Sequence, residues 1–274
     1  MTNPPPVWNG KGEDPWLPQR VSALLNAAKA ERSIYESVWD KLSSWLVTTT
    51  RKILGGPVIQ PEMAFAQAPA WSHAVDEIIV QSIMPVMGWA YQGLFGPHYH
   101  WQDRPNVLAY LSQVKNRMSH TPDEVFNLVA GQIASGVTLG EGIPELTERV
   151  DDVLSVTETA RWPNRAVVIA RTETLGALNG SRNDAFQAYD EEGDEELERM
   201  WLSTRDERTR PSHVLADLQR TSMTDPFIVG GASLMFPGDP AGPAQEVIQC
   251  RCTTLLLEKG ENVNLADRQL TRRR

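Results

Sequence analysis

Apolar residues recur at three- and four-residue intervals along much of the chain before about residue 189, which is the spacing of amphipathic helices. The first series starts at Leu17 and includes Leu46, and Gly55-Gly56-Pro57 is expected to end this helix. A second apolar segment covers about 70–94, where Pro85 is expected to bend or interrupt the helix. The N-terminal part is therefore expected to consist of long packed helices.

The next helices carry recognisable start signals. Residues 106–118 have helical spacing. Thr121 then predicts an N-cap, with Pro122 at the first helical position and Glu124 completing a capping box. This helix is expected to run to about Gly136.

Two further helices precede a change in composition. One follows Pro144, and the other starts near Asn164 and continues to about Tyr189. The acidic run DEEGDEELE, residues 190–198, predicts a solvated loop or linker. The helix that starts near Asn164 is expected to bridge the two halves of the chain.

Beyond the acidic run the pattern is typical of short strands joined by tight turns. RMWLST (199–204) predicts a short strand, and residues 227–243 alternate apolar positions with glycine and proline. VIQCRCTTLLL (247–257) predicts a buried strand that closes this region. The predicted fold class is α+β, with a mainly α-helical N-terminal part followed by a small C-terminal α+β module with short strands.

These patterns divide the chain into four segments. Proline at positions 4–6 and 15 predicts an extended conformation at the N-terminus. The expected segments are an extended Pro/Trp arm (1–16), a helical docking region (17–160), an α+β module (161–260) and a basic C-terminal tail (261–274).

The net charge of −9 and the pI of about 5.1 argue against general nucleic-acid binding. The N-terminus lacks the apolar stretch of a secretory signal, and no uninterrupted apolar window predicts a membrane span, so no membrane partner is expected. The chain has two cysteines, which do not make a disulfide framework. A reducing cytosol is the simplest compartment.

Tryptophan is frequent, with nine in the chain. Most lie in the arm and the predicted N-terminal helices, where large aromatic rings can pack against each other or against a partner. Trp8, Trp16, Trp39 and Trp45 are the expected partner contacts.

Common catalytic signatures are missing from the sequence. It contains no GxxxxGK[ST] phosphate loop, no GxGxxG, no HExxH and no GxSxG nucleophile elbow. Carboxylate pairs such as Asp151 and Asp152 have the spacing of a solvated helix face. These observations predict a protein that is not an enzyme.

The two cysteines form the motif Cys250-Arg251-Cys252. Because alternate residues of a strand share a face, both thiols are expected on one face and Arg251 on the other. His213 would add a third ligand for zinc, which usually takes four, and Asp206 or a water would be the fourth. The alternative is that His213 bonds a backbone carbonyl and the cysteines are core packing. A structural zinc is therefore a possible cofactor, and none is certain.

The turn STRDERTRPSH, residues 203–213, is highly charged. Arg205, Asp206, Glu207, Arg208 and Arg210 are five charges in six residues. Such density in a turn predicts a salt-bridged network or a contact surface. Arg251 is expected to pair with Asp206 or Asp239.

Three stretches carry a resemblance to a known family: IARTETLGALNGSRNDAF (169–186), WLSTRDERTRPSHVLADLQR (201–220) and FIVGGASLMFPGDPAGPAQEVIQCRCTTL (227–255). Their order resembles the phage Mu F-like minor head proteins of tailed bacteriophages. The motif residues that match are Arg171, Glu173, Trp201, Asp206, Arg208, Asp239 and Arg251. Some relatives place two cysteines where this chain has Arg210 and His213. That pattern favours a metal site, although a guanidinium is not a ligand.

The resemblance implies a minor capsid protein that binds the portal vertex inside the head and assists head assembly or DNA packaging and ejection. The implied partners are the portal protein, with major capsid or scaffolding protein and local contact with packaged DNA. The implied location is the capsid interior near the portal, with the host cytoplasm during assembly.

Two alternatives remain open at this stage. One is a zinc hydrolase with Asp206 or Glu207 as base. The other is a DNA-contacting accessory protein that uses residues 205–210 and the arginines of the tail. The arginines of the tail are Arg268, Arg272, Arg273 and Arg274.

Overall fold

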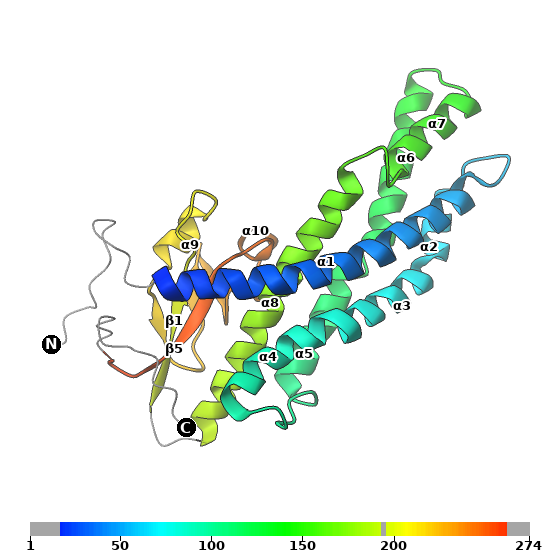
Figure 1. Ribbon diagram of the computed structural model, residues 1–274. Helices are drawn as coiled ribbons and strands as arrows, with labels where there is room; N and C mark the ends of the chain where they lie inside the picture. Colours follow the sequence, from blue (N-terminus) through cyan, green and yellow to red (C-terminus); the bar gives the residue numbers. More distant parts are fainter. Residues whose placement is uncertain (1–16, 193–195, 262–274) are drawn as a thin grey trace.

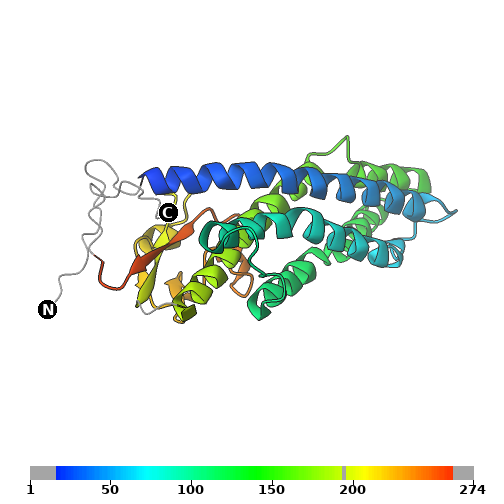
Figure 2. The ribbon, with the colours of Figure 1, turned by 60° about the horizontal axis from the view of Figure 1, so that its bottom comes forward.

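The computed structural model describes residues 17–192 and 196–261. The molecule is elongated, and its two longest described helices are α1 (Leu17–Leu54) and α8 (Arg161–Glu192) (Figures 1 and 2). The other helices of the helical part are α2 (Met63–Ala66), α3 (Ala68–Ile78), the π-helical η1 (Ile79–Ile83), α4 (Met84–Phe95), α5 (Pro105–Met118), α6 (Thr121–Thr138) and α7 (Ile143–Leu154). The strands gather at one end, and the turn between α6 and α7 lies at the other (Figure 1).

Helix α1 confirms the first predicted periodicity. Its buried side chains include Ile34, Val38 and Leu42, each fully buried and one helical turn or so apart. The helix ends at Leu54, directly before the two glycines, and Arg51 and Lys52 lie in its last turn, where positive charge complements the helix dipole.

The second apolar segment is a helical run with a defect before Pro85. Five residues of π-helix, Ile79–Ile83, separate α3 from α4, and Pro85 lies in the first turn of α4. Proline has no N–H for the regular ladder, which accounts for a local change of helix type. The predicted interruption at Pro85 is thus confirmed.

This same run, Ala68–Phe95, is long and apolar enough by length and composition to cross a membrane. Its mean hydropathy is 1.2, and 44% of its most apolar window is buried inside the protein. The segment packs against α1 and α8 (Figure 2). Core helices of soluble proteins pass the same test.

The predicted capping box before α6 is wrong. The N-cap position is held by His120, and no side chain caps this helix. Thr121 is the first helical residue, and its hydroxyl donates to the carbonyl of Met118 over 3.2 Å. The acceptor is the last residue of the preceding helix α5, so the threonine side chain bonds to the backbone before it and not to the helix that it begins.

The C-terminal module, residues 196–261, confirms the α+β fold class. Strands β1 (Leu197–Leu202), β2 (Arg220–Thr221) and β5 (Thr253–Glu258) form an antiparallel sheet in the order β2-β1-β5. Strands β3 (Phe227–Val229) and β4 (Ala232–Leu234) form a hairpin. Its turn, Gly230-Gly231, has positive φ at both residues, which suits glycine. The short helices are α9 (Pro211–Leu215) and α10 (Ala244–Val247).

The prediction of one strand over 247–257 is wrong at its beginning. Residue Val247 ends α10, and β5 begins only at Thr253. Gln249 has φ of 57°, in the left-handed region, which no strand accommodates. The two cysteines therefore lie in a loop before the strand.

Helix α8 joins the helical part to the module. The side chain of Asn179 donates to the carbonyl oxygens of Pro237 (3.0 Å) and Cys252 (2.9 Å). A Cβ atom on Gly180 would lie 3.2 Å from the ring of Phe236, so glycine permits this close approach. The bridging position predicted for this helix agrees with its contacts, while the predicted domain boundaries stay a prediction.

The start of α1 also reaches the module. Buried Arg20 forms two 3.0 Å bonds to the carboxylate of Asp217, which follows α9. The same carboxylate accepts the backbone N–H of Ser203 over 2.7 Å. The module is therefore attached at two places, on α1 and on α8.

Candidate functional site

His213 lies in the middle of the short helix α9 and points into the module. Its Nδ1 atom is 3.3 Å from the Sγ atom of Cys252 and 3.6 Å from that of Cys250. All three side chains are buried, with at most 2% exposed. The three residues that sequence reasoning grouped as metal ligands are therefore brought together.

The loop before β5 places both thiols on the same side. The left-handed residue Gln249 turns the chain, and its N–H donates to the hydroxyl of Thr172 in α8 over 3.1 Å. The carbonyl of Cys252 is held by Asn179, also in α8. The expected neighbourhood of the cysteines is confirmed, although a loop fastened to α8 produces it in place of strand alternation.

A fourth residue of the site, Glu246, was missed by sequence reasoning. Its Oε2 atom is 3.0 Å from Nε2 of His213 and accepts the hydroxyl of Ser212 over 2.8 Å. The carboxyl is almost buried, at 9% exposed. The available signal was an acidic residue four positions before Cys250, but nothing in the local pattern marked it as buried.

The electrostatics of the cluster favour one thiolate. Hydrogen bonding from Cys252 lowers the pKa of Cys250 to about 5 against the effect of burial, and His213 adds to the lowering. Burial and the neighbouring Cys250 raise the pKa of Cys252 well above its ordinary value. Burial lowers the pKa of His213, but Cys250 and Glu246 outweigh it and the net shift is upward.

Trp201 of β1 forms a wall of the site. Its ring meets that of His213 edge-on, with centroids 5.6 Å apart and planes at 83°. Its buried indole nitrogen has no hydrogen-bond partner among the described residues. The indole N–H nevertheless lowers the pKa of Cys252, because its dipole favours negative charge on that sulfur even without a hydrogen bond of ordinary geometry.

The arrangement allows two kinds of chemistry. Thiolate and imidazole groups are common zinc ligands. A histidine that is oriented by a carboxylate can also activate a neighbouring cysteine as a nucleophile. A nucleophile needs access to substrate. None of the three cavities described for residues 17–192 and 196–261 is lined by His213, Cys250 or Cys252. Burial therefore favours an ion over a substrate.

Asp206 does not join the cluster. Its carboxylate forms a bidentate ion pair with Arg251 and accepts the N–H of Arg208 over 3.1 Å. Arg251 thus has the partner that the sequence suggested. The hydrogen bonds from Arg251 lower the pKa of Asp206 to about 2, which makes this carboxylate a poor general base for a zinc hydrolase.

The remaining motif residues mostly hold the fold. Arg171 pairs with Glu31 of α1 over 2.8 Å, and buried Glu173 pairs with Arg117 of α5 over 2.6 Å. The carboxylate of Asp239 accepts the backbone N–H groups of Met235 and Ala241, over 2.8 and 2.9 Å, and so shapes the Pro-Gly-Asp-Pro turn.

A charged groove runs between α1, α8 and the cysteine loop. Its volume is about 580 Å³, and its charged lining residues are Glu31, Arg171, Asp206, Arg208, Arg210 and Arg251. Four arginines against two carboxylates give the groove a positive balance. Arg208 is exposed, and Arg210 donates to the carbonyl of Ile248.

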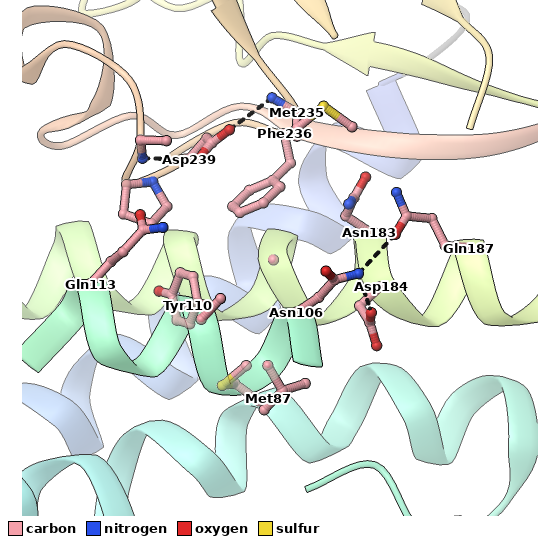
Figure 3. A pocket seen from close by; sticks show the side chains of 15 residues that line it. Met87, Asn106, Tyr110, Gln113, Asn183, Asp184, Gln187, Met235, Phe236 and Asp239 are labelled. Atoms are coloured by element: carbon pink, nitrogen blue, oxygen red, sulfur yellow. Dashed lines mark hydrogen bonds between the residues drawn. The ribbon is translucent and has the colours of Figure 1, made fainter. Parts of the chain in front are cut away.

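A second cavity, of about 270 Å³, lies where the helical part meets the module (Figure 3). Asp184 of α8 is its main charged group and accepts hydrogen bonds from Tyr91 and Asn106, each over 2.8 Å, and from Arg104. Asn106 also donates to Gln187 over 3.1 Å. These polar groups form hydrogen bonds with one another. We therefore interpret the cavity as a packing gap between the helical part and the module, and we call this boundary the seam.

Of the four tryptophans expected to contact a partner, the structure describes Trp39 and Trp45. Trp45 is 6% exposed and donates to the carbonyl of Gln67 over 2.9 Å, so its role is in the helical core and the prediction is wrong. Trp39 packs partly buried on the same core. Trp8 and Trp16 lie outside the described residues.

Residues 127–255 match the family model described as Phage Mu protein F like protein. This segment, which is just under half of the chain, is similar to the Mu F-like family. It begins in α6, contains all of the cysteine-histidine cluster and ends in β5. The resemblance carried by the sequence motifs is confirmed by this match.

One curated relative is an Enterococcus faecalis protein named NAD(+)–arginine ADP-ribosyltransferase EFV. It is 27% identical over 191 residues, which are 62% of this chain and 37% of the relative. The chain thus spans well under half the length of this relative. No solved structure matches the chain.

That relative corrects one sequence-based prediction. The absence of common catalytic motifs led to the expectation that the chain is not an enzyme. A relative that carries an enzyme's name contradicts this expectation. The motif search covered a few widespread signatures, and enzymes outside those classes pass it unnoticed.

Proposed function

We propose that this Mu F-like protein is a minor capsid protein that binds the portal vertex inside the phage head and assists head assembly or DNA packaging and ejection. The family match over residues 127–255 is the observation that carries this proposal. The elongated form supports it, because the molecule presents a helical end well separated from its strand-containing end (Figure 1).

The turn between α6 and α7 is the proposed portal contact. Val137, Leu139 and Ile143 are 60%, 71% and 52% exposed there. Exposed apolar side chains that cluster are typical of protein interaction sites. The turn also lies inside the segment that matches the family.

Co-expression with the portal protein of the same phage tests this contact. The wild-type chain is expected to co-elute with portal rings on size exclusion. Leu139→Asp/Ile143→Asp should abolish co-elution, because charge in an apolar interface is not compensated. Val80→Asp is the matched control, since Val80 is 61% exposed on η1 and away from the turn. A wild-type chain that never co-elutes and is missing from virions would contradict the proposal.

We also propose local contact with packaged DNA through the charged groove. The arginine excess there contrasts with the net charge of −9 for the chain. Binding through phosphates weakens steeply as salt rises. Arg208→Glu should weaken DNA binding and flatten its salt dependence, whereas Arg32→Glu, at an exposed site on α1, should not. Salt-independent binding would argue against the groove.

The relative's name supplies a second candidate, transfer of ADP-ribose from NAD⁺ to arginine. The matched 191 residues favour testing it on the whole chain. Incubation with labelled NAD⁺ and an arginine-rich acceptor protein measures the activity directly. Label that reaches the acceptor only when the chain is present supports transferase activity, and its absence removes this candidate.

A further inference from the structure

We propose that His213, Cys250 and Cys252 bind a zinc ion that closes the C-terminal module, with Glu246 orienting the histidine. Nothing in this inference depends on portal binding. It rests on the geometry, the burial and the hydrogen bonds of four side chains.

The ligand atoms have the separations that zinc requires. With Zn–N of about 2.0–2.1 Å and Zn–S of about 2.3 Å, tetrahedral coordination places nitrogen and sulfur about 3.5 Å apart. The observed Nδ1–Sγ distances are 3.3 Å to Cys252 and 3.6 Å to Cys250. The three ligand atoms all lie within 4.8 Å of one another. An ion at their centre needs little movement of any side chain.

Glu246 supplies the partner that a metal-bound histidine usually has. A ligating imidazole commonly donates its other N–H to a carboxylate, which fixes the ring orientation and the tautomer. Here Nε2 faces Oε2 of Glu246 at 3.0 Å, which leaves the Nδ1 lone pair directed at the two sulfurs. Ser212 fixes the carboxylate in turn, over 2.8 Å.

Core packing alone explains this arrangement less well. Among the described residues, the Nδ1 atom of buried His213 has only sulfur atoms as hydrogen-bond partners, and weak S–H hydrogen bonds stabilise it little. Burying a polar group without a good partner costs free energy, and the Nδ1 atom of His213 is such a group. A bound cation would compensate both the thiolates and the imidazole lone pair.

The three protein ligands leave one coordination position, which a small ligand such as water would fill. Sulfur and imidazole ligands favour zinc over magnesium or calcium, which prefer oxygen. Asp206 does not fill the position, because Arg251 holds its carboxylate.

The ion would connect parts of the module that are distant in sequence. His213 belongs to α9, and the cysteines lie between α10 and β5. Both cysteines also belong to the module's main apolar cluster. Metal binding to such a site contributes directly to folding, since the unfolded chain does not hold the ligands together.

Metal analysis of the full chain tests the proposal. Protein expressed with zinc supplementation and then dialysed is expected to contain about one zinc per chain. The Cys250→Ser/Cys252→Ser variant should lose it, because a serine hydroxyl is a poor zinc ligand. His98→Ala/His100→Ala is the matched control, since both residues are exposed and should not change the zinc content.

A second measurement covers the case in which the cysteine variant does not fold. Co²⁺ added alone to metal-free wild-type protein should give the intense absorption of thiolate-to-cobalt charge transfer. Glu246→Gln keeps the size of the side chain and both cysteines, and should weaken Co²⁺ binding by about 10–100-fold. Folded wild-type protein that contains no zinc and shows no cobalt absorption would overturn the proposal. So would equal zinc in the wild type and the cysteine variant.

Discussion

The helical part and the C-terminal module are stabilised in different ways. The helical part has one apolar cluster that extends from Ala27 in α1 to Ala185 in α8. The module's main apolar cluster is much smaller, and a separate small cluster of Met200, Leu202 and Leu257 lies elsewhere in the module. The main cluster consists of Trp201, Ala216, Phe227, Val229, Leu234, Val247, Cys250 and Cys252. A small core supplies limited free energy, so the module needs other contacts to hold its short strands.

Those other contacts are buried and polar. Arg199 of β1 is fully buried and donates to the carbonyl oxygens of Ser222 (3.1 and 2.9 Å), Asp225 (2.6 Å) and Met235 (2.6 Å). Burial lowers the pKa of this arginine to about 10. One side chain thus satisfies three carbonyl groups in two segments of irregular backbone that lack strand partners. Periodic apolar residues therefore stabilise the helical part, whereas the module depends in addition on specific buried polar side chains.

The largest expected effect comes from opening the helical core. Trp162 is fully buried in α8, and its indole N–H donates to the carbonyl of Val153 over 3.2 Å. Trp162→Ala should lower the free energy of unfolding by about 4 kcal/mol, since it leaves a large cavity and an unpaired carbonyl. Chemical denaturation followed by circular dichroism measures it. A decrease in the free energy of unfolding of less than about 1 kcal/mol would show that this core does not stabilise the helical part.

Next comes the buried ion pair between α1 and the module. Asp217→Ala removes the partner of Arg20, whose side chain is 3% exposed, and should cost about 3 kcal/mol. Asp217 holds the module segment around it in place, so limited proteolysis should cut the variant first within residues 203–221. Cleavage that begins in α4 or α5 would contradict the assignment of this pair to the module.

Acid is expected to have a smaller effect and to destabilise the module before the helical part. Arginine partners lower the pKa of Asp206 to about 2, and those of Asp217 lower its pKa despite burial. A carboxyl with a depressed folded-state pKa stabilises the fold above its unfolded pKa of about 4, and this contribution is lost as the pH falls towards the folded value.

Glu173, a buried carboxyl of the helical part, has a pKa shift of the opposite sign. Burial raises the pKa of Glu173, so acid does not weaken the fold through this group. Between about pH 4 and pH 2 the module is therefore expected to lose amide protection before α8 does. Simultaneous loss in both regions would show that these carboxylates do not distinguish them.

The smallest expected effect concerns the seam. A Cβ atom on Gly180 would lie 3.2–3.3 Å from Phe236 and 3.3 Å from Tyr110. Gly180→Ala should therefore cost about 1 kcal/mol through crowding, in spite of alanine's better helix propensity. Arg32→Ala removes an exposed pair with Glu36 and serves as the control, with a change within about 0.5 kcal/mol. A stabilised Gly180→Ala variant would show that the seam can relax.

The same contrast explains what the sequence could predict. The long helices follow from apolar spacing, and α1 and α8 agree with their predicted ranges within a few residues. The strand assigned to 247–257 fails because Gln249 adopts a left-handed conformation that a contact with Thr172 supports. Such a contact between residues distant in sequence leaves no local pattern.

The candidate site shows the same limit. His213, Cys250 and Cys252 were recognisable because their side chains have few common roles together. Glu246 was not, because its importance depends on the position of the His213 ring in α9. It also depends on the close approach of Gly230, where a Cβ atom would lie 2.5 Å from the Glu246 carboxylate. Local chemistry was predictable, and the partner that orients it required the fold.

Hydrogen exchange of the full chain, with and without a zinc chelator, tests most directly whether the two regions are held in different ways. We expect chelation to remove amide protection from residues 211–221 and 244–258, while α1 and the first half of α8 keep theirs. Unchanged protection throughout, or equal loss in both regions, would contradict it.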